Sequence, residues 1–273
     1  MIKRIIPSSG ELLPVVGLGT WATFDVTGTS AYPDLKNVLT IVYDAGGTLI
    51  DSSPMYGMAE EVIGNITADM PVKNEFFYAT KVWTTGRQEG ISQMERSMQR
   101  MGRDTIDLMQ IHNLTDWKTH LATLNQWKAE GKIRYTGITH YTDSMHEELE
   151  RIISKEQVDF VQFNYSILSR NAEKRLLQAA ADHSVATLIN RPLGEGSLFQ
   201  KVKGKPLPLW ANEVGIHSWG AFFLKYIIGH PAVTCVIPAT RNPAHADNNM
   251  QAGSIHLPDE AMRRKMVEYV LSL

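Results

Sequence analysis

Short apolar segments alternate with longer amphipathic segments along almost the whole chain. The apolar segments predict buried strands and occupy residues 15–18, 48–50, 77–80, 106–111, 133–138, 159–163, 185–189 and 233–237. The segments between them predict helices near residues 34–45, 59–66, 90–101, 118–130, 143–154, 171–182, 214–229 and 243–251. In the sixth of these, Ala172, Leu176 and Ala180 recur on one helical face. Eight alternations of strand and helix indicate a parallel sheet with helices outside it.

A closed eight-stranded barrel and an open, doubly wound sheet both fit this alternation. The first strand-to-helix turn favours the barrel, because Gly17 and Gly19 are followed by Thr20 and Trp21, and no GxGxxG motif is present. We therefore predict an α/β fold in which residues 1–273 form a single (β/α)8 TIM barrel. Two segments outside the alternation, residues 1–13 and 258–271, predict an N-terminal β-hairpin that closes the bottom of the barrel and an extra C-terminal helix. Residues 190–213 predict a long loop, and such loops are usually functional.

The composition narrows the range of partners. The chain has 27 basic and 29 acidic side chains, so no basic stripe for nucleic acid or a membrane surface is predicted. No apolar run approaches the ~20 residues that span a bilayer. The lone cysteine, Cys235, lies among apolar residues that predict a core strand, and it fits a reducing compartment. We expect a cytoplasmic protein, monomeric or weakly homo-oligomeric, although a periplasmic protein whose export signal had been removed would present the same sequence.

Polar side chains follow three successive predicted strands. Asp51 and Tyr56 follow the second strand, Lys81 ends the third, and His112 ends the fourth. In a barrel these strand ends converge on one mouth. Reduction of a carbonyl group needs a proton donor, and the reference pKa of tyrosine, ~10, is lowered by a nearby ammonium group such as that of Lys81. Asp51 would keep Lys81 charged, and His112 would either hydrogen-bond the substrate oxygen or relay a proton. Each donor to the developing oxyanion is worth ~3 kcal/mol.

These residues belong to longer segments that resemble the aldo-keto reductases. The segments cover nearly the whole chain in order and are GLGTW (17–21), DAGG (44–47), Asp51-Ser52-Ser53 with Tyr56-Gly57, ATK (79–81), DLMQIH (107–112), GITHY (137–141), QFNYS (162–166), RPLG (191–194) and IPAT (237–240). The resemblance implies a catalytic tetrad of Asp51, Tyr56, Lys81 and His112. It also implies reduction of a small carbonyl substrate by NADPH, with NADH as the alternative.

The resemblance further implies where the cofactor binds. Thr139, His140 and Gln162 match positions that hold the nicotinamide amide, and the stretch from Pro192 to Leu198 matches the loop over the pyrophosphate. The remaining cofactor positions, including those for the adenosine and its 2′-phosphate, are Gly19, Thr20, Trp21, Asp51, Asn190, Arg191, Leu193, Gly194, Gly196, Ile237, Pro238, Ala239, Thr240, Arg241, His245, Asn248 and Asn249. A helix that begins near residue 243 would favour phosphate at its N-terminus, and the guanidinium of Arg241 suits a phosphate.

The chain also departs from the family pattern. His140 stands where relatives often have asparagine, and Asn190 stands where many have an aromatic residue that stacks on the nicotinamide. Ala239 replaces a lysine near the 2′-phosphate, which weakens the expected preference for NADPH, whereas Arg241 restores part of it. We expect the walls of the substrate pocket to come from Trp21, Phe24, Tyr56, Trp83, His112, Asn113 and Trp117.

Two other classes of function remain open at this point. One is a regulatory subunit that senses nucleotides with little turnover, as in the potassium-channel β subunits, which resemble this fold. The other is an unrelated barrel lyase or isomerase, which would need a metal or phosphate site. The sequence predicts no metal site.

Overall fold

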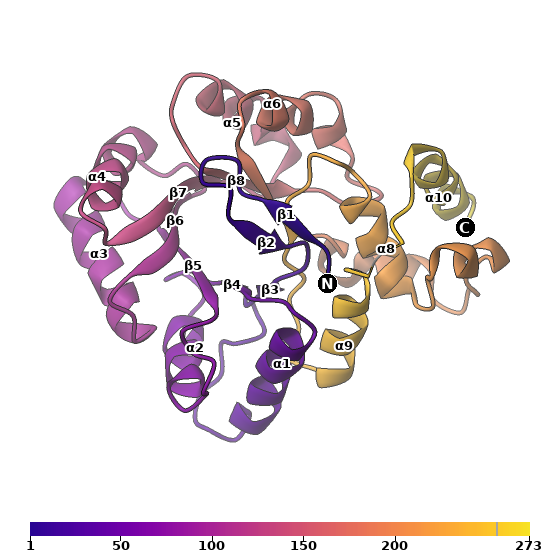
Figure 1. The fold of residues 1–273 in the computed structure, drawn as a ribbon, viewed down its shortest axis with the longest axis horizontal. Helices are drawn as coiled ribbons and strands as arrows, with labels where there is room; N and C mark the ends of the chain where they lie inside the picture. Colours follow the sequence, from indigo (N-terminus) through magenta and orange to yellow (C-terminus); the bar gives the residue numbers. More distant parts are fainter. Residues whose placement is uncertain (255) are drawn as a thin grey trace.

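Eight parallel strands form a nearly closed barrel in the computed structural model, which describes residues 1–254 and 256–273 (Figure 1). The strands are β3 (Leu18–Gly19), β4 (Leu49–Asp51), β5 (Phe77–Val82), β6 (Ile106–His112), β7 (Ile133–Thr139), β8 (Phe160–Asn164), β9 (Ala186–Asn190) and β10 (Cys235–Val236), and they pair in chain order. The first and last strands meet where Val236 N donates to Val15 O at 2.9 Å and Gly17 N donates to Val236 O at 2.9 Å. The prediction of a (β/α)8 fold is therefore confirmed.

Glycine allows this closure at the mouth. A Cβ at Gly19 would lie 2.7 Å from the carbonyl oxygen of Ile237. A side chain at this position would therefore push the first strand away from the last.

Helices surround the barrel, as the alternation predicts (Figure 1). They are α1 (Tyr32–Asp44), α2 (Ala59–Ala68), α3 (Arg87–Arg100), α4 (Trp117–Ala129), α5 (His146–Ile153), α6 (Leu176–Asp182), α7 (Ser197–Lys201), α8 (Trp219–Ile228), α9 (Pro243–Gln251) and α10 (Glu260–Ser272). None of them, in the part of the chain that is described, is long and apolar enough to cross a membrane.

The helix boundaries differ from prediction at three places. The helix expected from residue 214 begins only at Trp219, because Gly215 is left-handed and the hydroxyl of Ser218 caps the helix by accepting from Ala221 N. The helix expected over 171–182 is divided at Arg175, which is not helical. The loop expected over 190–213 contains helix α7 and two 3₁₀ turns.

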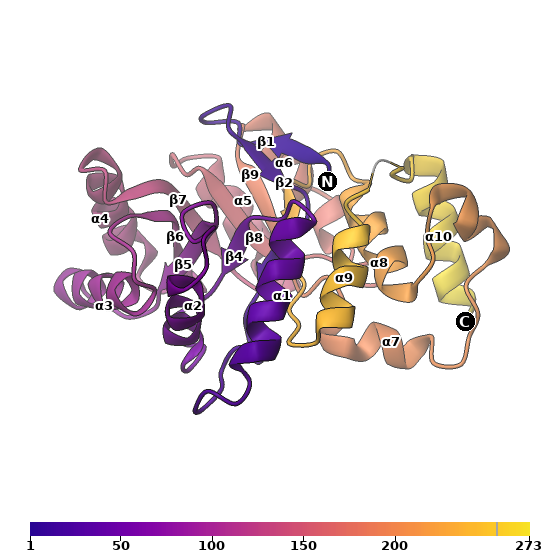
Figure 2. The same cartoon turned by 60° about the horizontal axis from the view of Figure 1, so that its bottom comes forward.

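The N-terminal hairpin closes one end of the barrel. Strands β1 (Lys3–Ile5) and β2 (Leu12–Pro14) are antiparallel, and Leu13 of β2 and Ile6, which follows β1, are buried. They pack in one apolar cluster with the barrel side chains Leu49, Phe77, Ala79, Leu108, Tyr135, Phe160, Ala186, Leu188, Cys235 and Ile237. Figure 2 shows the hairpin at one end of the barrel and α7 at the other. The expected hairpin is confirmed, and the open mouth is the end formed by the carboxyl ends of the strands.

Arg4 anchors this hairpin to the end of α8. Its guanidinium group donates to the carbonyl oxygens of Ile228 at 2.6 Å, His230 at 2.9 Å and Val233. We expect Arg4→Met to lower the free energy of unfolding by about 3 kcal/mol, because hydrogen bonds from a charged donor are lost and the carbonyl groups are left unpaired. Chemical denaturation measures this loss. Lys3→Met, at an exposed neighbouring position, is the control and should change stability by less than about 0.5 kcal/mol.

Candidate active site

The four residues of the expected tetrad come together at the mouth of the barrel. Asp51 is the last residue of β4, Lys81 lies near the end of β5, and His112 ends β6. The ammonium nitrogen of Lys81 lies 2.6 Å from Asp51 Oδ2 and 5.0 Å from the centre of the Tyr56 ring. The rings of Tyr56 and His112 meet edge to face, with centroids 5.8 Å apart. The carboxylate of Asp51, the ammonium of Lys81, the phenol of Tyr56 and the imidazole of His112 thus lie next to one another at the mouth of the barrel.

The buried ion pair keeps Lys81 charged. Burial lowers the pKa of Lys81, but Asp51 and then Tyr56 act in the opposite direction, and the pKa ends above its usual value. The ammonium group also donates to the carbonyl oxygen of Ser52 at 2.7 Å. A positive charge is therefore held beneath the Tyr56 ring at neutral pH.

Two amides hold the other oxygen of Asp51. Gln110 Nε2 and Gln162 Nε2 donate to Asp51 Oδ1 at 2.9 and 3.0 Å, and Gln162 Nε2 also donates to Gln110 Oε1 at 3.0 Å. Gln162 is a predicted cofactor position, whereas sequence reasoning missed Gln110. The signal available for Gln110 was a polar residue within the apolar run 106–111.

From the sequence, Lys81 is expected to lower the pKa of Tyr56, but in this structure that pKa is raised above its usual value. Burial raises the pKa of the Tyr56 phenol, and this effect exceeds the lowering by Lys81. The influence of Lys81 has the predicted sign but does not prevail in this structure. Tyr56 therefore carries its proton at neutral pH, and Lys81 limits the cost of losing that proton.

His112 is neutral over the ordinary pH range. Burial, followed by the charge of Lys81 and the proximity of His140, lowers the pKa of His112 to about 2. Its Nδ1 atom lies 2.9 Å from the hydroxyl oxygen of Ser53. Sequence reasoning did not single out Ser53, because serine after a strand is ordinary turn chemistry.

The positions expected to hold the nicotinamide amide continue this polar network. Thr139 Oγ1 donates to Gln162 Oε1 at 3.2 Å, and Asn190 Nδ2 lies 3.4 Å from the same oxygen and 3.3 Å from the carbonyl oxygen of His140. The oxygen of the Asn190 amide is buried and has no hydrogen-bond partner among the described residues. Such an oxygen fits a ligand that brings an N–H group, as a carboxamide does.

The loop after β9 exposes a cation beside this network. The Arg191 guanidinium lies 4.2 Å from the centre of the Tyr141 ring, which stacks on His140 at 5.2 Å, and it forms an ion pair of 2.9 Å with Glu195. Gly194 and Gly196 in this loop have positive φ. Pro192 and Leu198 are buried, and the Leu198 side chain packs in the core beneath the helices.

Two backbone N–H groups at the start of α9, which were expected to favour a phosphate, are already hydrogen-bonded within the protein. Asn242, which sequence reasoning missed, caps this helix by accepting from Ala244 N at 2.9 Å and His245 N at 3.4 Å. The expected positions nearby are divided: Arg241 and His245 are exposed, whereas Thr240 is buried. Of the remaining expected positions, three are buried: Ile237, Pro238 and Asn249. Asn248 is partly buried, and Ala239 is exposed.

The expected walls of the substrate pocket are only partly in place. Trp21 and Trp83 are exposed at 47% and 42%, and the Trp83 ring lies 6.3 Å from that of His112. Trp117 is half-buried, and Asn113 has positive φ and a buried, unpaired amide oxygen among the described residues. Phe24 is wholly buried in the outer core. The expectation that Phe24 forms a pocket wall is therefore wrong in this structure.

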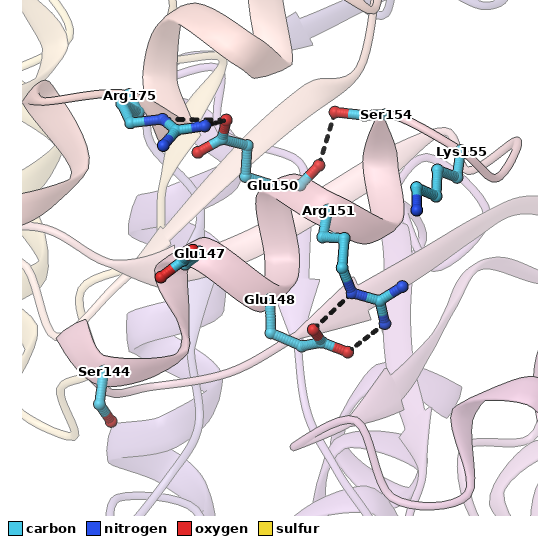
Figure 3. Close-up of a pocket in the computed structure, with 8 residues that line it drawn as sticks. All are labelled: Ser144, Glu147, Glu148, Glu150, Arg151, Ser154, Lys155 and Arg175. Atoms are coloured by element: carbon cyan, nitrogen blue, oxygen red, sulfur yellow. Dashed lines mark hydrogen bonds and ion pairs between the residues drawn. The ribbon is translucent and has the colours of Figure 1, made fainter.

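A hollow on the outer surface does not compete with the mouth. It lies beside α5, and four of its charged side chains form two ion pairs, Arg151 with Glu148 and Arg175 with Glu150, each at 2.5 Å (Figure 3). Exposed ion pairs of this kind are worth little and do not by themselves indicate a site for chemistry.

Comparison with known proteins shows which protein family the chain belongs to. The sequence profile of the aldo/keto reductase family matches residues 15–265, and the chain belongs to this family. Over 269 residues it is 28% identical to methylglyoxal reductase YeaE of Escherichia coli, covering 94% of this chain and 92% of that protein. It is 27% identical over 229 residues to the NADH-specific methylglyoxal reductase of the same organism, covering 72% and 69%.

A solved structure agrees in fold. The aldo/keto reductase of Klebsiella pneumoniae in complex with NADP and acetate superposes with a TM-score of 0.81 at 23% identity, covering 99% of this chain and 96% of that one. The family resemblance is therefore confirmed, and the chain is an oxidoreductase of the aldo/keto reductase family. The alternative of an unrelated lyase or isomerase is wrong, and nothing in the comparisons favours a nucleotide-sensing subunit.

Proposed function

We propose that this protein reduces an aldehyde or a simple ketone to the alcohol, with Tyr56 as the general acid. The observation that carries the proposal is the buried Lys81–Asp51 pair of 2.6 Å, directly beside the Tyr56 ring and near a neutral His112. Among the family's reactions this arrangement suits the protonation of an oxygen anion, because it combines a protonated phenol, a fixed cation and a neutral donor.

The residues divide the work as follows. A nicotinamide held beside Gln162 would supply the hydride that the carbonyl carbon accepts. The Tyr56 hydroxyl gives its proton to the carbonyl oxygen as negative charge develops there. The Lys81 ammonium stabilises the phenolate that remains, and Asp51 holds that ammonium in place. His112 orients the carbonyl group by a hydrogen bond, and the exposed Trp21 and Trp83 flank the entrance.

The residues around Gln162 fit a nicotinamide. The Asn190 amide, whose buried oxygen has no hydrogen-bond partner among the described residues, contacts His140 and Gln162 through its nitrogen, and Thr139 bonds Gln162. Together these groups offer both hydrogen-bond donors and acceptors to a carboxamide. We propose NADPH as the preferred cofactor, with NADH as the alternative. One relative is NADH-specific, whereas the Klebsiella structure holds NADP, so family membership leaves the choice to local residues.

Arg241 supplies the test of this preference. It is exposed beside the start of α9, where its guanidinium can reach a 2′-phosphate. We expect Arg241→Ala to raise the Kd for NADPH about tenfold and to leave the Kd for NADH unchanged, because a charge-assisted hydrogen bond is worth ~1.5–3 kcal/mol. Fluorescence titration with each nucleotide measures both values. An equal loss for the two nucleotides would show that Arg241 does not read the phosphate.

The direct test of the function is turnover. The protein is mixed with NADPH and, in turn, methylglyoxal, an aromatic aldehyde and a simple ketone, and oxidation of the nucleotide is followed by its loss of absorbance. We expect turnover with at least one aldehyde. Tight binding of NADPH without turnover of any carbonyl compound would contradict the proposal and favour a nucleotide-sensing role.

A further inference from the structure

The hydroxyl group of Ser53 lies against one ring nitrogen of His112, Nδ1. Ser53 Oγ and His112 Nδ1 are 2.9 Å apart, and Ser53 has no exposed surface. The backbone N–H of Met55 donates to the same oxygen at 3.3 Å. The other ring nitrogen, His112 Nε2, forms no hydrogen bond to any residue in the described part of the chain. One nitrogen of the ring is therefore engaged, and the other is free for a ligand.

The direction of the Ser53–His112 hydrogen bond follows from counting protons. A neutral imidazole carries one N–H, and a serine hydroxyl carries one O–H. Since Met55 N–H already points at Ser53 Oγ, the hydroxyl proton is left to be donated, and among the described residues His112 Nδ1 is its hydrogen-bond acceptor. If Nδ1 carried the proton instead, two N–H groups would meet at Ser53 Oγ, and the buried hydroxyl proton would have no acceptor. An unsatisfied buried donor is costly, so the first arrangement prevails.

We propose that Ser53 is a positioning residue that holds His112 as the tautomer with its proton on Nε2. That tautomer presents an N–H donor to the substrate carbonyl oxygen, whereas the opposite tautomer would present a lone pair to it. The role of this tautomer in catalysis rests on the proposed function. The tautomer itself is a property of the protein without substrate and can be measured independently of turnover. A neutral histidine acts as a permanent donor here because a serine, rather than a carboxylate, contacts its other nitrogen.

The chain offers a matched control at the next position. Ser52 is also fully buried, but its hydroxyl oxygen accepts from Thr20 Oγ1 at 3.1 Å and has no hydrogen bond to His112. Ser52→Ala and Ser53→Ala therefore remove the same atom from adjacent buried positions, and only the second touches the imidazole. Ser53→Thr keeps a hydroxyl group and serves as the conservative variant.

The test is nitrogen NMR of histidine-labelled protein with NADPH bound, in which the chemical shifts of Nδ1 and Nε2 report which nitrogen carries the proton. In the unsubstituted protein we expect His112 to be protonated on Nε2 at every pH from 6 to 9. Ser53→Ala should bring a measurable share of the opposite tautomer and lower kcat about tenfold, with little change in the Kd for NADPH. Ser52→Ala should keep the Nε2–H tautomer, and Ser53→Thr should restore it.

The outcomes separate this inference from the proposed function. A proton on Nδ1 in the unsubstituted protein would overturn the inference, whether or not any carbonyl compound is reduced, and so would unchanged shifts and kcat in Ser53→Ala. If the tautomer responds as expected but no carbonyl compound is turned over, the role of Ser53 stands and the proposed reaction fails. The measurement on the unsubstituted protein remains decisive even if a serine variant does not fold.

Discussion

Tyr56→Phe is expected to lower kcat for carbonyl reduction by about 10²–10⁴-fold, because a positioned general acid contributes a factor of this size. The substitution removes one oxygen and keeps the ring that packs edge to face against His112. The substitution leaves the hydrogen bonds of Lys81 to Asp51 and Ser52 in place, so the site should keep its shape. NADPH should still bind with a Kd within about twofold of the original value, since the phenol serves the substrate oxygen.

Steady-state turnover and a fluorescence titration together measure this prediction. Tyr43→Phe is the matched control, because the Tyr43 hydroxyl bonds only Glu75 on the exposed outer face of the protein, among the residues described. That variant should keep full activity. Turnover by Tyr56→Phe at the original rate would show that another group protonates the alkoxide.

The periodic parts of the fold could be predicted from the sequence. Apolar runs bounded by turn residues located the strands, and the position of Lys81 and His112 at the ends of two such runs placed both at one mouth. That inference needs no coordinates, because parallel strands in a barrel direct their carboxyl ends to the same side. The helix boundaries were less predictable, since a single cap such as Ser218 or a non-helical residue such as Arg175 decides them.

The features of the site that the sequence did not predict depend on how deeply a side chain is buried and on contacts between segments that are distant in the chain. The net pKa of Tyr56 depends on the balance between burial and the charge of Lys81, and the sequence states the charge but not the burial. Phe24 was placed at the pocket by its position in the chain, yet its side chain turns into the outer core. Gln110 and Ser53 gain their importance only from the partners that β4 and β6 bring to them.

The contacts make Asp51 the centre of the site. One of its oxygens binds Lys81, and the other accepts from two amides, one of which, Gln162, belongs to the network beside Asn190. The cofactor side and the proton-donating side of the site are thus joined through one carboxylate. A change at Lys81 should accordingly affect the stability of the fold as well as the chemistry.

We expect Lys81→Met to lower both the free energy of unfolding and the kcat. The substitution keeps most of the side-chain volume but leaves the Asp51 carboxylate, which is 2% exposed, without its counter-charge. Removing one partner of a buried ion pair costs ~3–5 kcal/mol, and we expect the free energy of unfolding to fall by about that amount. The kcat should fall by at least about 10²-fold, because the Tyr56 phenolate would form without a cation beside it.

The double variant Lys81→Met with Asp51→Asn separates these two losses. Asparagine removes the uncompensated charge, so the double variant should recover most of the stability that Lys81→Met loses, as measured by chemical denaturation. Its kcat should stay as low as that of Lys81→Met, because the double variant also has no cation to stabilise the Tyr56 phenolate. Recovery of turnover together with stability would mean that Lys81 only holds the fold, and that the proton donation by Tyr56 needs no ammonium group.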